Sequence, residues 1–134
     1  MTLKKSTHYA LYAALEMARA GRGVQVTVSQ VAQRYEIPTA VLAKVFQQLV
    51  RSGIAVGTRG TRGGYSLARS PSELTVLDVI RVFESEPDGA QHQGPLRKLF
   101  DEVDEQVRCT YASVTLETLA GGRPEKEPRL HVVN

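Results

Sequence analysis

Residues 28–53 read VSQVAQRYEIPTAVLAKVFQQLVRSG, and this stretch decides the fold. Apolar residues recur every three or four positions in two short segments, which is the spacing of amphipathic helices. The segments meet at Pro38, and a proline is tolerated at the start of a helix. We therefore predict two short helices joined by a tight turn, the second ending at Gly53. The predicted buried face of that second helix comprises Val41, Leu42, Val45, Phe46, Leu49 and Val50.

A longer amphipathic helix is predicted before this pair. It ends at Gly21 to Gly23, and Ser6 or Thr7 can serve as its N-cap. Thr27 or Ser29 is the corresponding cap of the next helix. The N-terminus has two lysines before an apolar stretch, as a signal peptide does, but charged residues interrupt that stretch. We expect a helix of a cytoplasmic protein here.

The glycine-rich stretch VGTRGTRGGYSLA, residues 56–68, lies between two runs that are compatible with β-strands. A phosphate-binding P-loop needs a lysine followed by serine or threonine and then a helix, and the stretch has neither. A dinucleotide-binding fingerprint fails for the same reason. The glycines instead suit the tip of a β-hairpin, where positive φ angles are common. A hairpin therefore follows the helix pair.

The charge is unevenly distributed along the 134 residues. Residues 1–72 hold ten Lys and Arg against two Asp and Glu, a net charge of +8, whereas residues 73–134 hold seven against twelve, a net charge of −5. A basic surface attracts a polyanion such as nucleic acid. The composition, 42% apolar and 23% charged, is that of a globular protein without a membrane span. The single cysteine suits a reducing compartment.

Together these elements predict a mainly α fold with a small β-hairpin wing, a winged helix-turn-helix. We assign residues 1–84 to this DNA-binding region, in which Thr75 caps a further helix, and residues 85–94 to a loop. Residues 95–120 are expected to form a long helix and a short final helix. The Gly/Pro/charge-rich residues 121–134 are expected to form a flexible tail.

The exposed side of the second helix of the pair is the predicted reader of DNA bases. Thr39, Lys44 and Gln47 can donate hydrogen bonds to bases or phosphates. The small Ala40 and Ala43 allow close approach to a thymine methyl group.

The wing is predicted to contact DNA through its arginines. Arg59 is expected to enter a narrow, A/T-rich minor groove, whose negative potential attracts cations, and Arg62 to add a backbone contact. Tyr65 is expected to pack under the wing, with its hydroxyl near a phosphate.

Several motifs together resemble the Rrf2 family of bacterial winged-helix repressors, over about residues 3–120. The most specific are YAL in the first helix, IPTAVLAKVFQQL, RGTRGGYSLA and SELTVLDVI. The resemblance implies a homodimer on a pseudo-palindromic operator, with the long helix from near Pro95 as dimerisation helix and the first helix packed against the partner. By position it implies major-groove contacts for Pro38, Thr39, Ala40, Val41, Ala43 and Lys44, and a minor-groove contact for Arg59. Gly60, Thr61 and Arg62 at the wing tip, with Gln47, Tyr65, Lys4 and Tyr9, complete the predicted DNA-binding set.

The chain departs from the cluster-binding members of that family, which place three cysteines in the loop before the long helix. Here the loop reads SEPDGAQHQGPL and holds no cysteine, so we expect no cofactor and no thiolate-ligated iron–sulfur cluster. Cys109 falls within the long helix and is expected to be a small buried residue. His8 and His92 remain candidate metal ligands, so that sensing of metal or redox through His8, His92 or Cys109 stays an alternative.

The sequence therefore predicts a transcriptional regulator, a repressor, that binds double-stranded DNA. A rival interpretation is a winged-helix module whose basic face docks an acidic protein partner. No nucleophile–base pair or paired carboxylates point to an enzyme. An unknown regulatory protein or a small ligand remains open as the signal.

Overall fold

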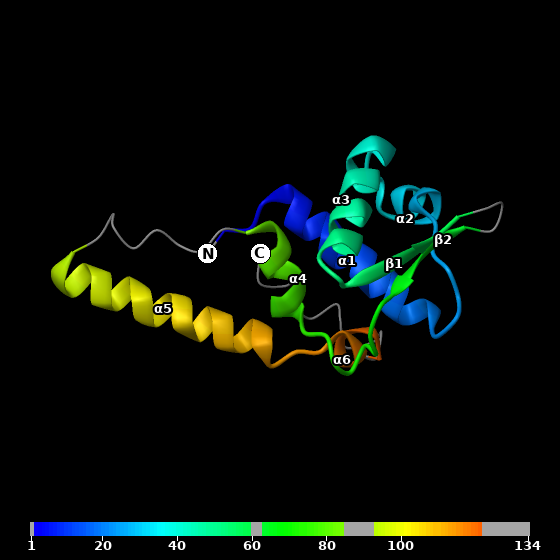
Figure 1. The fold of residues 1–134 in the computed structure, drawn as a ribbon. Helices are drawn as coiled ribbons and strands as arrows, with labels where there is room; N and C mark the ends of the chain where they lie inside the picture. Colours follow the sequence, from blue (N-terminus) through cyan, green and yellow to red (C-terminus); the bar gives the residue numbers. More distant parts are fainter. Residues whose placement is uncertain (1, 60–62, 85–92, 122–134) are drawn as a thin grey trace.

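The structure, a computed structural model, describes residues 2–59, 63–84 and 93–121. Within these ranges three helices are followed by a two-stranded hairpin and then by three more helices (Figure 1). The elements in chain order are α1 (Lys5–Ala20), α2 (Val28–Tyr35), α3 (Thr39–Arg51), β1 (Ala55–Thr58), β2 (Gly64–Leu67), α4 (Val76–Phe83), α5 (Gly94–Ala112) and α6 (Leu116–Ala120). The predicted mainly α fold with a β-hairpin wing is confirmed.

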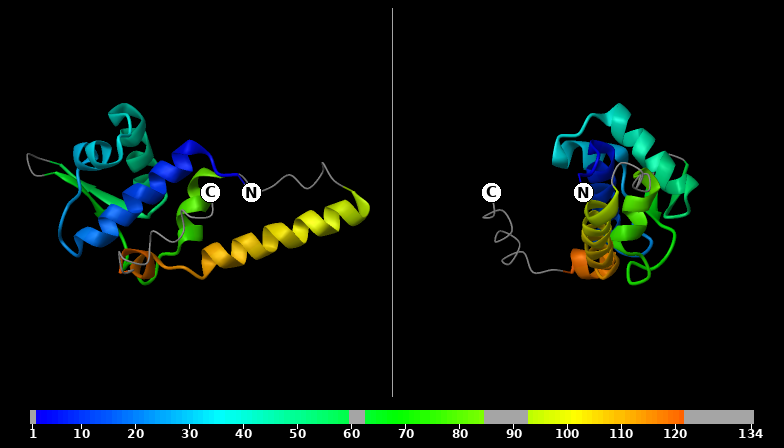
Figure 2. Two further views of the ribbon diagram at one scale, coloured as in Figure 1. Left: turned by 180° about the vertical axis from the view of Figure 1, so that it is seen from behind. Right: turned by 90° about the vertical axis from the view of Figure 1, so that its left-hand side faces the viewer.

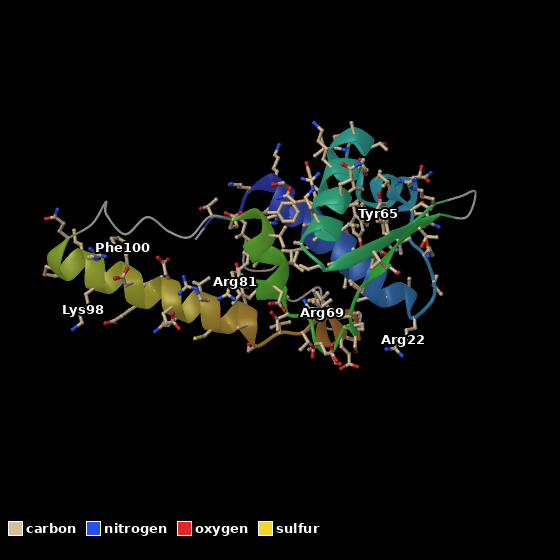
Figure 3. The ribbon with its side chains drawn as sticks, in the orientation of Figure 1. Arg22, Tyr65, Arg69, Arg81, Lys98 and Phe100 are labelled. Carbon is tan, nitrogen blue, oxygen red and sulfur yellow. The ribbon has the colours of Figure 1, made fainter. Side chains whose placement is uncertain are left out.

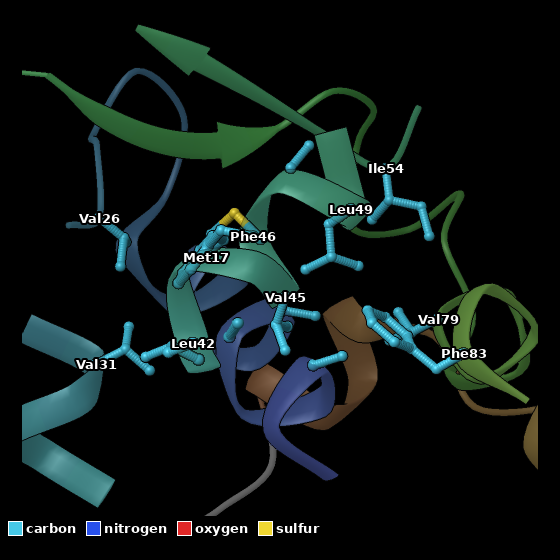
Figure 4. Packing of buried hydrophobic residues seen from close by; sticks show 14 of the residues in the cluster. Met17, Val26, Val31, Leu42, Val45, Phe46, Leu49, Ile54, Val79 and Phe83 are labelled. Carbon is cyan, nitrogen blue, oxygen red and sulfur yellow. The ribbon is translucent and has the colours of Figure 1, made fainter. Parts of the chain in front are cut away.

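Helix α1 lies at the centre of the core, in contact with α2, α3, α4, α6 and β2. Three of its inward positions are small: Ala10, Ala13 and Ala14 are fully buried. Small side chains let the neighbouring helices approach closely, and larger core residues come from those neighbours and from Met17 of α1 itself (Figure 4). Phe46 and Leu49 of α3 are fully buried among them.

The start of α1 differs from the prediction. The helix begins at Lys5, and Lys4 precedes it without a side-chain cap, so neither Ser6 nor Thr7 is the N-cap. Thr7 is instead fully buried, and its hydroxyl donates to Oε2 of Glu84 at 2.5 Å. A threonine near a helix start resembles a cap in sequence, but this hydroxyl is used by a carboxylate 77 positions away.

Two other predicted caps are confirmed, and both form capping boxes. The Thr27 side chain accepts from the N–H of Gln30, whose side chain accepts from the Thr27 N–H, so Thr27 rather than Ser29 caps α2. Thr75 and Asp78 form the same arrangement at the start of α4. These reciprocal bonds satisfy N–H groups that a helix start leaves unpaired.

The buried stripe of α3 is narrower than predicted. Leu42, Val45, Phe46 and Leu49 are buried, whereas Val41 is 41% exposed and Val50 37% exposed. Val41 and Val50 lie at the two edges of the stripe, where the helix turns from the core toward solvent. Their predicted burial is therefore wrong.

Helix α5 projects away from the body made by the other helices, as the two views in Figure 2 show. Within the described chain it contacts α4, and none of its residues is buried. Cys109 on α5 is exposed, so its predicted burial does not hold within the single chain. The backbone around Val114 and Leu116 hydrogen-bonds to the segment before α4, and Leu116 enters the core. Most of the predicted loop and almost all of the predicted tail lie outside the described residues.

Candidate nucleic-acid interface

The first turn of α3 presents an exposed surface of small and polar side chains. Pro38 precedes the helix with φ −58° and ψ 130°, and no side chain caps it. The N–H groups of the first turn are therefore available to an outside acceptor such as a phosphate oxygen. The exposed predicted contacts here are Pro38, Thr39, Ala40, Val41, Lys44 and Gln47, and Ala43 is partly buried.

The opposite face of α3 explains why these residues are held outward. Leu42, Phe46 and Leu49 are fully buried, which fixes the rotation of the helix about its axis. Burying side chains of this size contributes about 1.5–3 kcal/mol each. The exposed row is therefore a rigid surface of the kind that enters a major groove.

The wing is an antiparallel hairpin that pairs Ala55 with Leu67 and Thr58 with Gly64. Arg59 follows β1 directly and is exposed. The predicted contacts Gly60, Thr61 and Arg62 lie outside the described residues.

Tyr65 anchors the wing, as predicted from its position. Its ring stacks on Phe46 with the ring centroids 4.5 Å apart, and Figure 3 shows it close to α3. Gly57 on the facing strand leaves room for this ring, because a Cβ there would stand 3.2 Å from it. The contact with Phe46 sets the position of the hairpin relative to the predicted reading helix. A contact between the Tyr65 hydroxyl and a phosphate stays a prediction.

A groove of about 770 Å³ lies between α3 and the wing. Gln47 and Arg51 line it from α3, and Thr58 and Arg59 line it from the hairpin. Thr27, directly before α2, also lines it. The structure thus places side chains from the predicted reading helix and from the wing around one groove. Thr27 and Thr58 were not among the predicted DNA contacts, because the capping signal of Thr27 and the strand-like position of Thr58 do not indicate that either lines a groove.

The residues at the start of α1 are occupied by contacts within the chain. The N–H of Lys4 donates to Glu84 at 2.7 Å, and its ammonium donates to the carbonyl of Phe83 at 3.3 Å. Tyr9 packs against the core. His8 is exposed. DNA contacts of Lys4 and Tyr9 stay predictions.

The helix pair, the central α1 behind it and the hairpin after it define a winged helix-turn-helix protein, a class that binds DNA. A model of the Rrf2 family, described as an iron-dependent transcriptional regulator, matches residues 3–122. The chain belongs to this family.

Named relatives agree with this assignment. A protein of Rhodopseudomonas palustris named BadM, an HTH-type transcriptional regulator by its description, is 36% identical over 127 residues, covering 89% of this chain and 81% of its own length. Among solved structures, CymR (YrzC), the global cysteine regulator of B. subtilis, has a TM-score of 0.81 at 27% identity, covering 90% of this chain and 96% of that one. IscR of T. potens shares the fold, with a TM-score of 0.80 at 24% identity over 94% of this chain and 91% of that one. The chain is thus a transcriptional regulator and not an enzyme.

The donor atoms of this chain do not fit the cysteine-ligated iron–sulfur cluster that an iron-dependent family suggests. The whole chain has one cysteine. Its thiol donates to Glu105 at 3.4 Å, and that hydrogen bond raises the pKa of Cys109. Within residues 2–59, 63–84 and 93–121, no three His, Cys, Asp or Glu side chains gather in a way that could hold a metal ion. His92 lies outside these ranges.

In the same part of the chain, no helix is both long enough and apolar enough to cross a membrane.

Proposed function

We propose that this chain is a sequence-specific repressor that acts in the cytoplasm and binds a pseudo-palindromic operator as a homodimer. The observation that carries the proposal is the exposed side of α3, whose first turn faces solvent and whose later residues Gln47 and Arg51 line one groove with the wing. The α3 side chains would meet base edges in the major groove, and Arg59 would enter the adjacent minor groove.

The side chains of α3 divide by chemistry into two kinds of base contact. Thr39, Lys44 and Gln47 are exposed donors, suited to base acceptors and phosphates. Ala40 and Val41 present exposed methyl groups, suited to the methyl group of thymine. The 41% exposure of Val41, which the buried-face prediction did not anticipate, supports its assignment to this surface.

The exposed face of α5 supports the homodimer. Four apolar side chains, at successive helical spacings, face solvent in the single chain: Leu96, Leu99, Phe100 and Val103. An apolar stripe of this kind on a projecting helix needs a cover, and a second copy of the helix provides a self-complementary one. Two recognition helices would then lie about one helical turn of DNA apart, roughly 34–36 Å.

We further propose that repression works without a thiolate-ligated cluster. The support is the count of one cysteine and its position in α5, remote in sequence from the loop at 85–94. A regulatory protein or a small ligand is then the signal.

Selection of duplexes from a random DNA pool by the purified protein tests the proposed function. We expect enrichment of a motif with two-fold symmetry, bound more weakly as salt rises because phosphate contacts release counterions. The same protein, purified without oxygen, is expected to show no visible absorption bands. Weak retardation of all duplexes alike, with no enriched motif, would contradict the proposal and favour a protein-docking module.

A further inference from the structure

The connector between α1 and α2 pairs with the second strand of the wing through an isolated bridge at Val26. Val26 and Tyr65 exchange two backbone hydrogen bonds, each 2.8 Å long. Gly64 lies directly against this connector, because a Cβ on it would stand 2.8 Å from the carbonyl oxygen of Val26. The second strand of the wing is therefore fixed to residues just before α2.

The first strand of the wing is held by one side chain of the same connector. The amide Nε2 of Gln25 donates to Oγ1 of Thr58 at 2.7 Å. Thr58 pairs with Gly64 across the hairpin, and a Gly64 Cβ would also stand 3.2 Å from the Cβ of Gln25. Glycine at position 64 thus leaves the space that the Gln25 side chain needs to reach Thr58 on the far strand.

The direction of this hydrogen bond determines what the Thr58 hydroxyl can do. A hydroxyl has one proton to donate and lone pairs that accept. Because Gln25 donates to its oxygen, Thr58 keeps its own proton for another acceptor. Thr58 lines the groove between the wing and α3, next to Arg59 and across from Arg51. An acceptor that enters a groove with two arginines is an anion, and on the proposed function it is a DNA phosphate.

The other polar atom of the Gln25 side chain reduces what this contact contributes to stability. Its Oε1 atom is buried and has no hydrogen-bond partner within the described part of the chain. An unpaired buried acceptor is unfavourable, and it offsets what the bond to Thr58 contributes. An apolar side chain of nearly the same shape would remove both the hydrogen bond to Thr58 and the unpaired buried acceptor.

We propose that Gln25 is a positioning residue for DNA binding. It holds Thr58 at the base of the wing, so that the Thr58 hydroxyl donates to a phosphate and Arg59 is directed into the minor groove. This inference rests on the proposed function and extends it to a residue outside both the reading helix and the hairpin.

The test compares Gln25→Met with the wild type on two duplexes. One carries the motif that the wild type selects, with an A/T-rich wing site, and the other has that site replaced by G/C pairs. We expect Gln25→Met to bind the first duplex about fivefold to tenfold more weakly and to lose much of the preference between the two, while its thermal midpoint stays unchanged. Gln33→Met makes the same chemical change at an exposed position of α2 and is expected to bind both duplexes as the wild type does.

The double variant Gln25→Met with Thr58→Val tests whether Gln25 affects DNA binding through Thr58 or independently of it. If Gln25 acts through Thr58, the double variant binds as weakly as Thr58→Val alone. Wild-type affinity of Gln25→Met on both duplexes, additive losses in the double variant, or a loss that follows a lowered thermal midpoint would each overturn the inference. Failure of the wild type itself to prefer any duplex would instead overturn the proposed function.

Discussion

At the scale of single residues, the buried hydroxyl of Thr7 joins the first helix to the end of α4. Its hydrogen bond, together with the N–H of Lys4, holds the pKa of Glu84 below its ordinary value. We expect Thr7→Val, which keeps the shape and removes the donor, to lower the free energy of unfolding by about 1–2 kcal/mol near neutral pH. Urea denaturation of both proteins measures this difference.

The hydrogen bond between Thr7 and Glu84 also predicts that the free energy of unfolding depends on pH. A carboxylate whose pKa is lowered by folding contributes stability above its unfolded pKa, near the ordinary value of 4.5, and loses it as the pH falls through the folded value. The difference between the wild type and Thr7→Val should therefore shrink in acid. A difference that stays constant at all pH values would show that Glu84 is not the partner that matters.

At the scale of elements, the capping box fixes the start of α2, where Thr27 lines the groove between α3 and the wing. Thr27→Ala removes the side-chain acceptor and is expected to lower the free energy of unfolding by about 1 kcal/mol. Ser29→Ala, two positions later and exposed, is the matched control and should change stability by a few tenths at most. Equal losses in the two variants would contradict the assignment of Thr27 as the cap.

The elements were largely predictable because their signals are local. The apolar spacing of α3 and the caps at Thr27 and Thr75 lie within a few residues of the structure that they specify. The signals that failed depend on distant neighbours. The hydroxyl of Thr7 is used by Glu84, and no spacing rule connects the two.

In the candidate site, too, the features that depend on local sequence patterns were predictable. The exposed row of α3 follows from its buried row, and Arg59 follows from the glycines around it. The edges of the buried row were not predictable, because the burial of an edge residue such as Val41 depends on which other elements pack against the helix. The bond between Gln25 and Thr58 spans 33 positions, and no local pattern pairs the two residues.

At the scale of the whole molecule, α5 is expected to hold two copies together. Leu99 is 52% exposed in the single chain, so a charge there leaves the fold of one copy intact but disrupts an apolar interface. Leu99→Glu should therefore have the mass of a single chain, 14.7 kDa, in light scattering, while the wild type has twice that mass. Lys98→Glu places the same acid on the polar side of the helix and should remain dimeric.

A dimer that persists in Leu99→Glu at micromolar concentration, or a wild type that is already monomeric, would contradict this assembly.

Sequence-specific binding by the whole molecule requires that the exposed row of α3 reads DNA bases. Repeating the random-pool selection with Thr39→Ala and with Lys44→Ala tests it, because each variant removes one exposed donor from that row. Arg22→Ala removes an exposed cation beyond the end of α1 and is the control (Figure 3). We predict that both α3 variants relax or change the preferred base at one symmetric pair of positions, at a cost on the order of 1–3 kcal/mol for each lost base contact, while the control selects the wild-type motif. Selection of the wild-type motif with wild-type affinity by both α3 variants would show that this helix is not the reader.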